Sequence, residues 1–144
     1  MDLVVDLKKL RQKAADIRKA LDDLSPFARQ TAEEFLNDAR GAAASKYYLI
    51  VAIEAAIDIC NHLAARLAKR APNSYADCFR ILVEARTISP SLGERLVEMA
   101  KFRNILIHRY GDVDDRKVHR IICLILEDLN RYLEELAALL RVPL

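Results

Sequence analysis

The side chains best suited to chemistry lie in one run, residues 102–112, which reads FRNILIHRYGD. Helical periodicity begins at Pro90, and Gly111 is expected to end that helix. The apolar residues of the predicted helix fall in a sector of roughly 80°: Leu92, Leu96, Met99, Leu106 and Tyr110. Arg103 lies in the middle of this sector, where a guanidinium is costly to bury unless an acid or a ligand pairs with it.

Two interpretations of Arg103 and His108 remain open from the residues alone. In the first, Arg103 forms a structural ion pair with an acid on a neighbouring helix, a common explanation of inward charges. In the second, the pair acts on RNA: His108 moves a proton and Arg103 neutralises charge on the phosphoryl oxygens. On an ideal helix the two side chains point about 140° apart, so they meet only if the last turn is irregular. Asn104 is then expected to hold phosphate or to orient His108.

A second set of polar residues recurs every four positions inside an apolar stretch: Glu54, Asp58 and His62. Consecutive members lie about 40° apart on a helix. Three interpretations are open, namely a structural set that pairs with Arg103, the lining of a cleft beside Arg103 and His108, and a metal site. The metal site is the least favoured, because no second helix offers a matching Glu-x-x-His.

The sequence predicts an all-α fold in a single domain over residues 1–144. The chain is 53% hydrophobic with only three glycines and four prolines, which favours long helices. We expect long helices over residues 3–24, 38–69, 74–85, 90–110 and 114–140, with a short segment behind the Thr31-x-x-Glu34 capping box. The last three helices are expected to begin at Ser74, Ser89-Pro90 and Asp114, with Ser74 and Asp114 as caps. Asp2 is the expected N-cap of the first helix, and Ser25-Pro26 its expected end.

Composition gives little indication of a partner. The formal net charge is +2, so the basic clusters are interpreted as solvated helix faces, although a basic RNA path across a dimer stays open. No signal peptide or long uncharged apolar run is visible, which predicts a cytoplasmic protein with no membrane contact. The cysteines Cys60, Cys78 and Cys123 are interpreted as reduced, buried small hydrophobes, and no zinc motif is present.

The motif FRNILIHRYGDVD resembles the R-x4-H-x-Y signature of HepT-like toxins, a group within the HEPN domains. The resemblance also covers residues 52–66 and 74–85, and so most of the chain from about residue 39 onward. It implies a HEPN-type bundle of about five helices that dimerises, with Arg103 and His108 as catalytic residues at the dimer cleft. Asn104, Glu54 and Asp58 would support them, without metal or cofactor.

The same resemblance implies a biological setting. HepT-like proteins are endoribonuclease toxins, each neutralised by a minimal nucleotidyltransferase antitoxin. In that family the tyrosine of the motif accepts AMP groups, so Tyr110 is the candidate acceptor here. The expected partners are therefore RNA, the cognate antitoxin and a second copy of the chain, within a homodimer or a larger hetero-oligomer. The alternatives are a non-catalytic RNA- or nucleotide-binding HEPN-like dimer, and a helical interaction protein without any RNA role.

Overall fold

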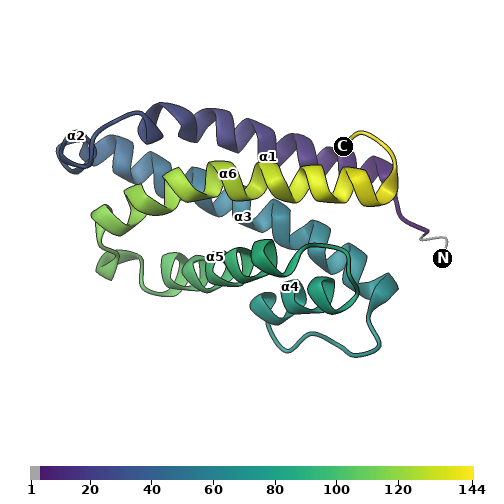
Figure 1. The fold of residues 1–144 in the computed structure, drawn as a ribbon. Coiled ribbons are helices and arrows are strands. Elements are labelled where there is room, and N and C mark those ends of the chain that lie inside the picture. The colour runs from purple at the N-terminus through teal and green to yellow at the C-terminus, as the bar shows by residue number, and fades with distance from the viewer. Residues whose placement is uncertain (1–3) are drawn as a thin grey trace.

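The computed structural model describes residues 4–144 and confirms the all-α prediction (Figure 1). Within this range the chain forms six α-helices and one turn of 3-10 helix: α1 (Leu7–Ala28), α2 (Ala32–Leu36), α3 (Ala39–Leu67), α4 (Tyr75–Glu84), α5 (Pro90–His108), η1 (Tyr110–Asp112) and α6 (Asp115–Leu140). The five long helices correspond to the predicted ones. The short α2 is the sixth, and both hydrogen bonds of its predicted capping box are present, between Thr31 and Glu34.

Helix α3 is the centre of the bundle. It contacts each of the other five α-helices and runs obliquely past α6, from the end near α2 to the end near α4 (Figure 1). Its 29 residues include Leu49, Ile53, Ile59 and Leu63, all without solvent exposure. Among residues 4–144 it is the one helix long and apolar enough to cross a bilayer, and 61% of its most apolar window is buried by the fold. This composition is therefore accounted for by a core helix.

The predicted burial of the cysteines is confirmed for two of the three. Cys60 and Cys78 are buried. The prediction was wrong for Cys123, which is exposed because it lies beside the buried stripe of α6 that includes Val118, Ile122 and Ile125.

Helix α1 differs from its predicted bounds at both ends. Its N-cap is Asp6, whose carboxylate accepts from the Lys9 amide, whereas Asp2 lies outside the described residues. The predicted end at Ser25-Pro26 was wrong, since the helix continues through Pro26 to Ala28. A proline in the last turn removes a single hydrogen bond. The extra residues bring Phe27 into edge-to-face contact with Phe35, at 6.3 Å between ring centroids.

Helix α5 begins as predicted and ends earlier than predicted. Ser89 caps it ahead of Pro90, and the Glu135 carboxylate of α6 accepts hydrogen bonds from the Ser89 amide at 2.7 Å and its hydroxyl at 3.0 Å. The expected end at Gly111 was wrong, because Arg109 leaves helical geometry with φ −135°. The chain then enters η1, so Tyr110 does not continue the apolar stripe and is 47% exposed.

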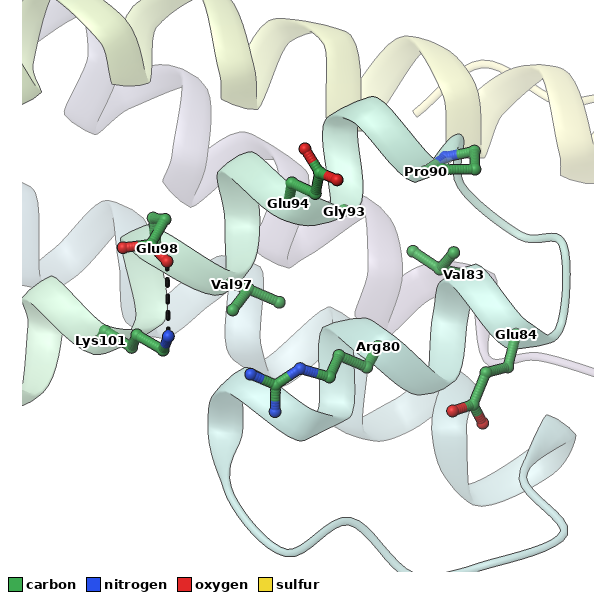
Figure 2. Close-up of a pocket in the computed structure, with 9 residues that line it drawn as sticks. All are labelled: Arg80, Val83, Glu84, Pro90, Gly93, Glu94, Val97, Glu98 and Lys101. Carbon is green, nitrogen blue, oxygen red and sulfur yellow. Dashed lines mark hydrogen bonds and ion pairs between the residues drawn. The ribbon is translucent and has the colours of Figure 1, made fainter.

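Close packing of α4 against α5 depends on Gly93. A Cβ atom at this position would lie 2.2 Å from Cγ2 of Val83, a distance at which the side chain or the helix must shift. Figure 2 shows the two residues facing each other across the α4–α5 contact. The helices approach this closely because α5 carries no side chain at this point.

We predict that Gly93→Ala lowers the free energy of unfolding by about 1–3 kcal/mol, the usual cost of overpacking. Urea unfolding followed by circular dichroism measures the change. Gly111→Ala is the matched control, because a Cβ there meets nothing within 4 Å and no glycine has positive φ. The double variant Gly93→Ala/Val83→Ala should lose less stability than the sum of the single changes. Additive losses would show that Val83 is not the obstacle.

Candidate active site

Arg103 forms the inward ion pair that the sequence left as one interpretation. Its side chain is 15% exposed on α5, and its partner is Glu54 of α3. The Glu54 Oε1 atom accepts from Nε at 2.7 Å and lies 2.5 Å from Nη2. The carboxylate therefore supplies the counter-charge that a guanidinium in an apolar sector requires.

Two further groups hold the Arg103 side chain. The Asn104 Oδ1 atom accepts a hydrogen bond from Nη1 at 3.2 Å. On another side the guanidinium carbon lies 5.0 Å from the ring centroid of Tyr75, within the range of a cation–π contact. The guanidinium is thus restrained by an acid, an amide and an aromatic ring from three different places in the chain.

Arg103 and His108 line the same cavity. This cavity has a volume of about 520 Å³ and is bounded by the end of α5, the start of α4, the preceding loop and one residue of α3. The lining residues are Asn61, Pro72, Asn73, Ser74, Tyr75, Arg103, Asn104 and His108. The exposed His108 is the last residue of α5, so both side chains reach this cavity despite their angular separation on the helix.

The three polar residues of α3 have three different partners. Glu54 pairs with Arg103, whereas Asp58 lies 3.0 Å from Nζ of Lys13 on α1 and its hydrogen bond raises the pKa of that lysine. His62 Nε2 accepts from the Asp6 amide at 3.1 Å. Burial is the main cause that lowers the pKa of His62, followed by nearby positive charge. Only Glu54 is brought to the Arg103 side chain, and within residues 4–144 these groups form no metal-ligand cluster.

The loop that walls the cavity is held by Asp77. Its carboxylate accepts from Arg70 at 2.6 and 3.0 Å, and from the Asn73 amide at 2.9 Å. These bonds, the one to Arg70 first, lower the pKa of Asp77 to about 2. The predicted cap at Ser74 is also present, since its hydroxyl accepts from the Asp77 amide at 3.0 Å. Asp77 therefore ties the loop to the first turn of α4.

Tyr110 is near the motif and is not among the residues that line the cavity. It lies in η1 with its ring 4.8 Å from Nζ of Lys46, which itself pairs with Asp115 at 3.0 Å. The tyrosine is thus presented on the surface next to a cation of α3. Its role as an AMP acceptor stays a prediction at this point.

A second cavity of about 600 Å³ lies further along α4 and α5 (Figure 2). Its lining combines two cations with three carboxylates and contains no histidine: Arg80, Lys101, Glu84, Glu94 and Glu98, besides Val83, Val97, Pro90 and Gly93. Since only the first cavity combines a fixed guanidinium with an imidazole, it is the candidate active site.

Five lining residues were not identified from the sequence as parts of a site: Asn61, Pro72, Asn73, Ser74 and Tyr75. By helical periodicity Tyr75 falls with Phe79 and Leu82 among the apolar positions of α4. Phe79 and Leu82 are fully buried, whereas Tyr75 is 38% exposed. Its place at the first residue of α4, directly after the Ser74 cap, was the available signal.

A family model described as "Ribonuclease HepT-like" matches residues 17–136. A tRNA nuclease HepT of Aphanizomenon flos-aquae is 24% identical over 120 residues, covering 83% of this chain and 82% of the relative. An mRNA nuclease HepT of Shewanella oneidensis is 31% identical over 85 residues, which cover 59% of this chain and 64% of that relative. The structure of tri-AMPylated Shewanella oneidensis HEPN toxin in complex with MNT antitoxin superposes with a TM-score of 0.81 at 25% identity, covering 90% of this chain and 97% of that one.

We predict that Asp77→Asn destabilises the fold above pH 4 and makes the loop a site of proteolytic cleavage. The pKa of Asp77 falls from its ordinary value of 3.8 to about 2 in the folded state. The charged carboxylate therefore stabilises the folded state above pH 4, and this contribution is lost as the pH falls towards 2. The stability difference from the unchanged chain should therefore shrink as pH falls from 4 towards 2. Urea titrations across this range measure it. Asp23→Asn, at an exposed pair with Lys19, is the control; an equal effect of both variants would argue against the clamp.

Proposed function

The chain belongs to the HepT-like ribonuclease family, and from this premise we propose that it is the endoribonuclease toxin of a toxin–antitoxin pair. Arg103 and His108 are the proposed catalytic residues, and the reaction requires no metal. The observation that carries the proposal is their joint position on one open cavity, with Arg103 already fixed by Glu54. The related tRNA and mRNA nucleases support RNA as the substrate class.

The proposed reaction uses the nucleophile that RNA itself provides. The 2′-oxygen attacks the adjacent phosphorus, the bond to the 5′-oxygen breaks, and a 2′,3′-cyclic phosphate and a 5′-hydroxyl remain. His108 removes the 2′-proton or protonates the leaving 5′-oxygen. Arg103 donates to the phosphoryl oxygens as negative charge grows there. Asn104 and Glu54 act as positioning residues, because they hold the guanidinium before substrate binds.

Asp58 was predicted as a supporting residue together with Glu54. Its ion pair with Lys13 connects α3 to α1, whereas the ion pair of Arg103 connects α5 to α3. We therefore propose that Asp58 supports the packing of the bundle and that Glu54 alone of the two supports the site.

A homodimer would complete the chemistry. One imidazole does not serve easily as base and acid within a single turnover, whereas two copies would bring two His108 side chains to one cleft. Ile107, beside His108, is 41% exposed, and an apolar side chain at this place is suited to a contact between copies. The antitoxin would join such a dimer in a larger hetero-oligomer.

The proposed antitoxin is a minimal nucleotidyltransferase that transfers AMP from ATP to the Tyr110 hydroxyl and releases pyrophosphate. Support comes from the AMPylated Shewanella toxin bound to its MNT antitoxin, and from the exposure of Tyr110. Each AMP adds negative charge and bulk next to the motif. Lys46, which lies over the ring, is placed to pair with the new phosphate. The modified toxin would repel RNA from the adjacent cavity.

His108→Ala should reduce cleavage of labelled single-stranded RNA in EDTA by roughly 10²–10⁴-fold, the usual contribution of general acid–base catalysis. Intact mass is checked first, so that modified protein is not assayed. Arg109→Ala, an exposed neighbour, serves as the control. Products of the unchanged protein should end in a 2′,3′-cyclic phosphate.

Equal cleavage by His108→Ala would contradict the assigned role. A folded, unmodified and inactive wild-type protein that binds RNA would instead support the non-catalytic binding module.

Co-expression with the cognate nucleotidyltransferase, in cells that supply ATP, should add AMP to Tyr110. Peptide mass spectrometry should locate the adduct there, and RNA cleavage should fall in step with modification. Tyr110→Phe should stay unmodified and should keep cleaving RNA in the presence of the enzyme. Tyr47→Phe, at another exposed tyrosine, should be modified normally. An adduct on a different residue, or none in an inhibited complex, would exclude Tyr110 as the acceptor.

A further inference from the structure

Tyr75 is an aromatic side chain that the fold leaves partly open to solvent. It is 38% exposed on the wall of the cavity that contains Arg103 and His108. One turn further along α4, Phe79 is completely buried and supplies the packing that this face of the helix needs. The Tyr75 ring is therefore not required to fill the core.

The Tyr75 ring and the Arg103 guanidinium are neighbours on the cavity wall, and the guanidinium lies over one face of the ring, so a base would stack on the other face. The guanidinium carbon lies 5.0 Å from the ring centroid, and Glu54 holds the guanidinium in place. In RNA a phosphate and its neighbouring base are joined by a single ribose. A phosphate bound at Arg103 would consequently bring an adjacent base within reach of the Tyr75 ring.

Two amide side chains complete the wall opposite the motif. The Asn61 Oδ1 atom accepts from the Cys78 thiol at 3.3 Å, and within residues 4–144 its Nδ2 group makes no hydrogen bond. Asn73 is held through its backbone amide by Asp77, at 2.9 Å, while its side chain stays unpaired among the described residues. Both amides line the cavity and are available to a ligand. Amides of this kind recognise the hydrogen-bonding edges of bases.

We propose that this cavity is a nucleobase subsite, in which a base adjacent to the scissile phosphate stacks on Tyr75 and bonds to Asn61 and Asn73. The inference rests on the proposed ribonuclease function and adds the groups that select the substrate. The cavity volume of about 520 Å³ is sufficient for one base with its ribose and phosphate. A base can enter only if it is unpaired, so the subsite favours single-stranded RNA.

Binding is measured in the His108→Ala background, so that the RNA stays intact. A short fluorescent RNA is titrated with protein and followed by anisotropy. Tyr75→Leu should weaken binding roughly 5- to 150-fold, the range for loss of one base–aromatic stack. Tyr75→Phe should bind normally because it keeps the ring. Tyr47→Leu is the matched control, the same substitution at an exposed tyrosine of α3.

A set of RNAs, each with an abasic nucleotide at a different position, separates stacking from a purely structural role. With Tyr75 present, one abasic position next to the cleavage site should weaken binding at least as much as Tyr75→Leu, because the contacts to Asn61 and Asn73 are lost together with the stack. In the Tyr75→Leu protein the same abasic change should cost clearly less affinity than in the protein with Tyr75, because the stack is already missing. This comparison also keeps the test valid if Tyr75→Leu folds poorly, since the abasic RNA probes the unchanged Tyr75 side chain.

The outcomes distinguish this proposal from the function on which it rests. If wild-type protein cleaves RNA while Tyr75→Leu binds as tightly as the control, the base subsite is wrong and the ribonuclease stands. The base subsite is also wrong if kcat falls in Tyr75→Leu without any abasic effect, because the ring then only positions Arg103. If RNA binds with the expected Tyr75 dependence and is never cleaved, the subsite stands and the ribonuclease is wrong. Absence of any RNA binding would overturn both.

Discussion

The ion pair between Arg103 and Glu54 is the constraint on which the rest of the site depends. Helix α5 packs through Leu92, Leu96 and Leu106, which are buried, and Arg103 occupies the same sector of the helix. Such packing is stable only if the guanidinium meets a counter-charge, and the central helix α3 provides it. The pair therefore helps to hold α5 against α3. It also sets where the guanidinium points.

The same pair determines what Arg103 has left to offer a substrate. A guanidinium has five N–H donors on three nitrogens. Nε and Nη2 contact Glu54, and Nη1 donates to Asn104, so each nitrogen uses one N–H group in these contacts. Remaining N–H groups stay available to a phosphate. An arginine that is already immobile loses little entropy when the phosphate arrives, and its dipoles need no reorganisation in the transition state. Glu54 partly neutralises the charge of Arg103, which weakens its attraction for a phosphate. The fixed position of the guanidinium offsets this loss, as long as the carboxylate does not cover the N–H groups that face the cavity.

Local signals in the sequence predicted much of the fold. Caps at Thr31, Ser74, Ser89 and Asp114 located helix starts correctly, because a capping side chain bonds to an amide two or three residues away. The end of α5 was not predictable in this way, since Arg109 leaves the helix without a glycine or proline at its own position. The inward Arg103 and its need for an acid were visible from periodicity. That Glu54 rather than Asp58 meets it depends on how three helices cross, which no local pattern contains.

The cavity is lined by a helix on one side and by a loop on another. The proposed cleavage chemistry belongs to the helix, and the proposed choice of RNA sequence belongs to the loop and the start of α4. Arg103 and His108 belong to one helix whose buried face and counter-charge leave little freedom for change. The facing wall, with Asn73, is a loop held mainly through the Asp77 carboxylate and the cap of α4. Loop residues outside those bonds contribute little to the core, so they vary at small cost in stability. If the base binds against this wall, as proposed, the RNA sequence that is chosen would change with the loop and the first residue of α4, while the proposed catalytic pair, Arg103 and His108, stays the same.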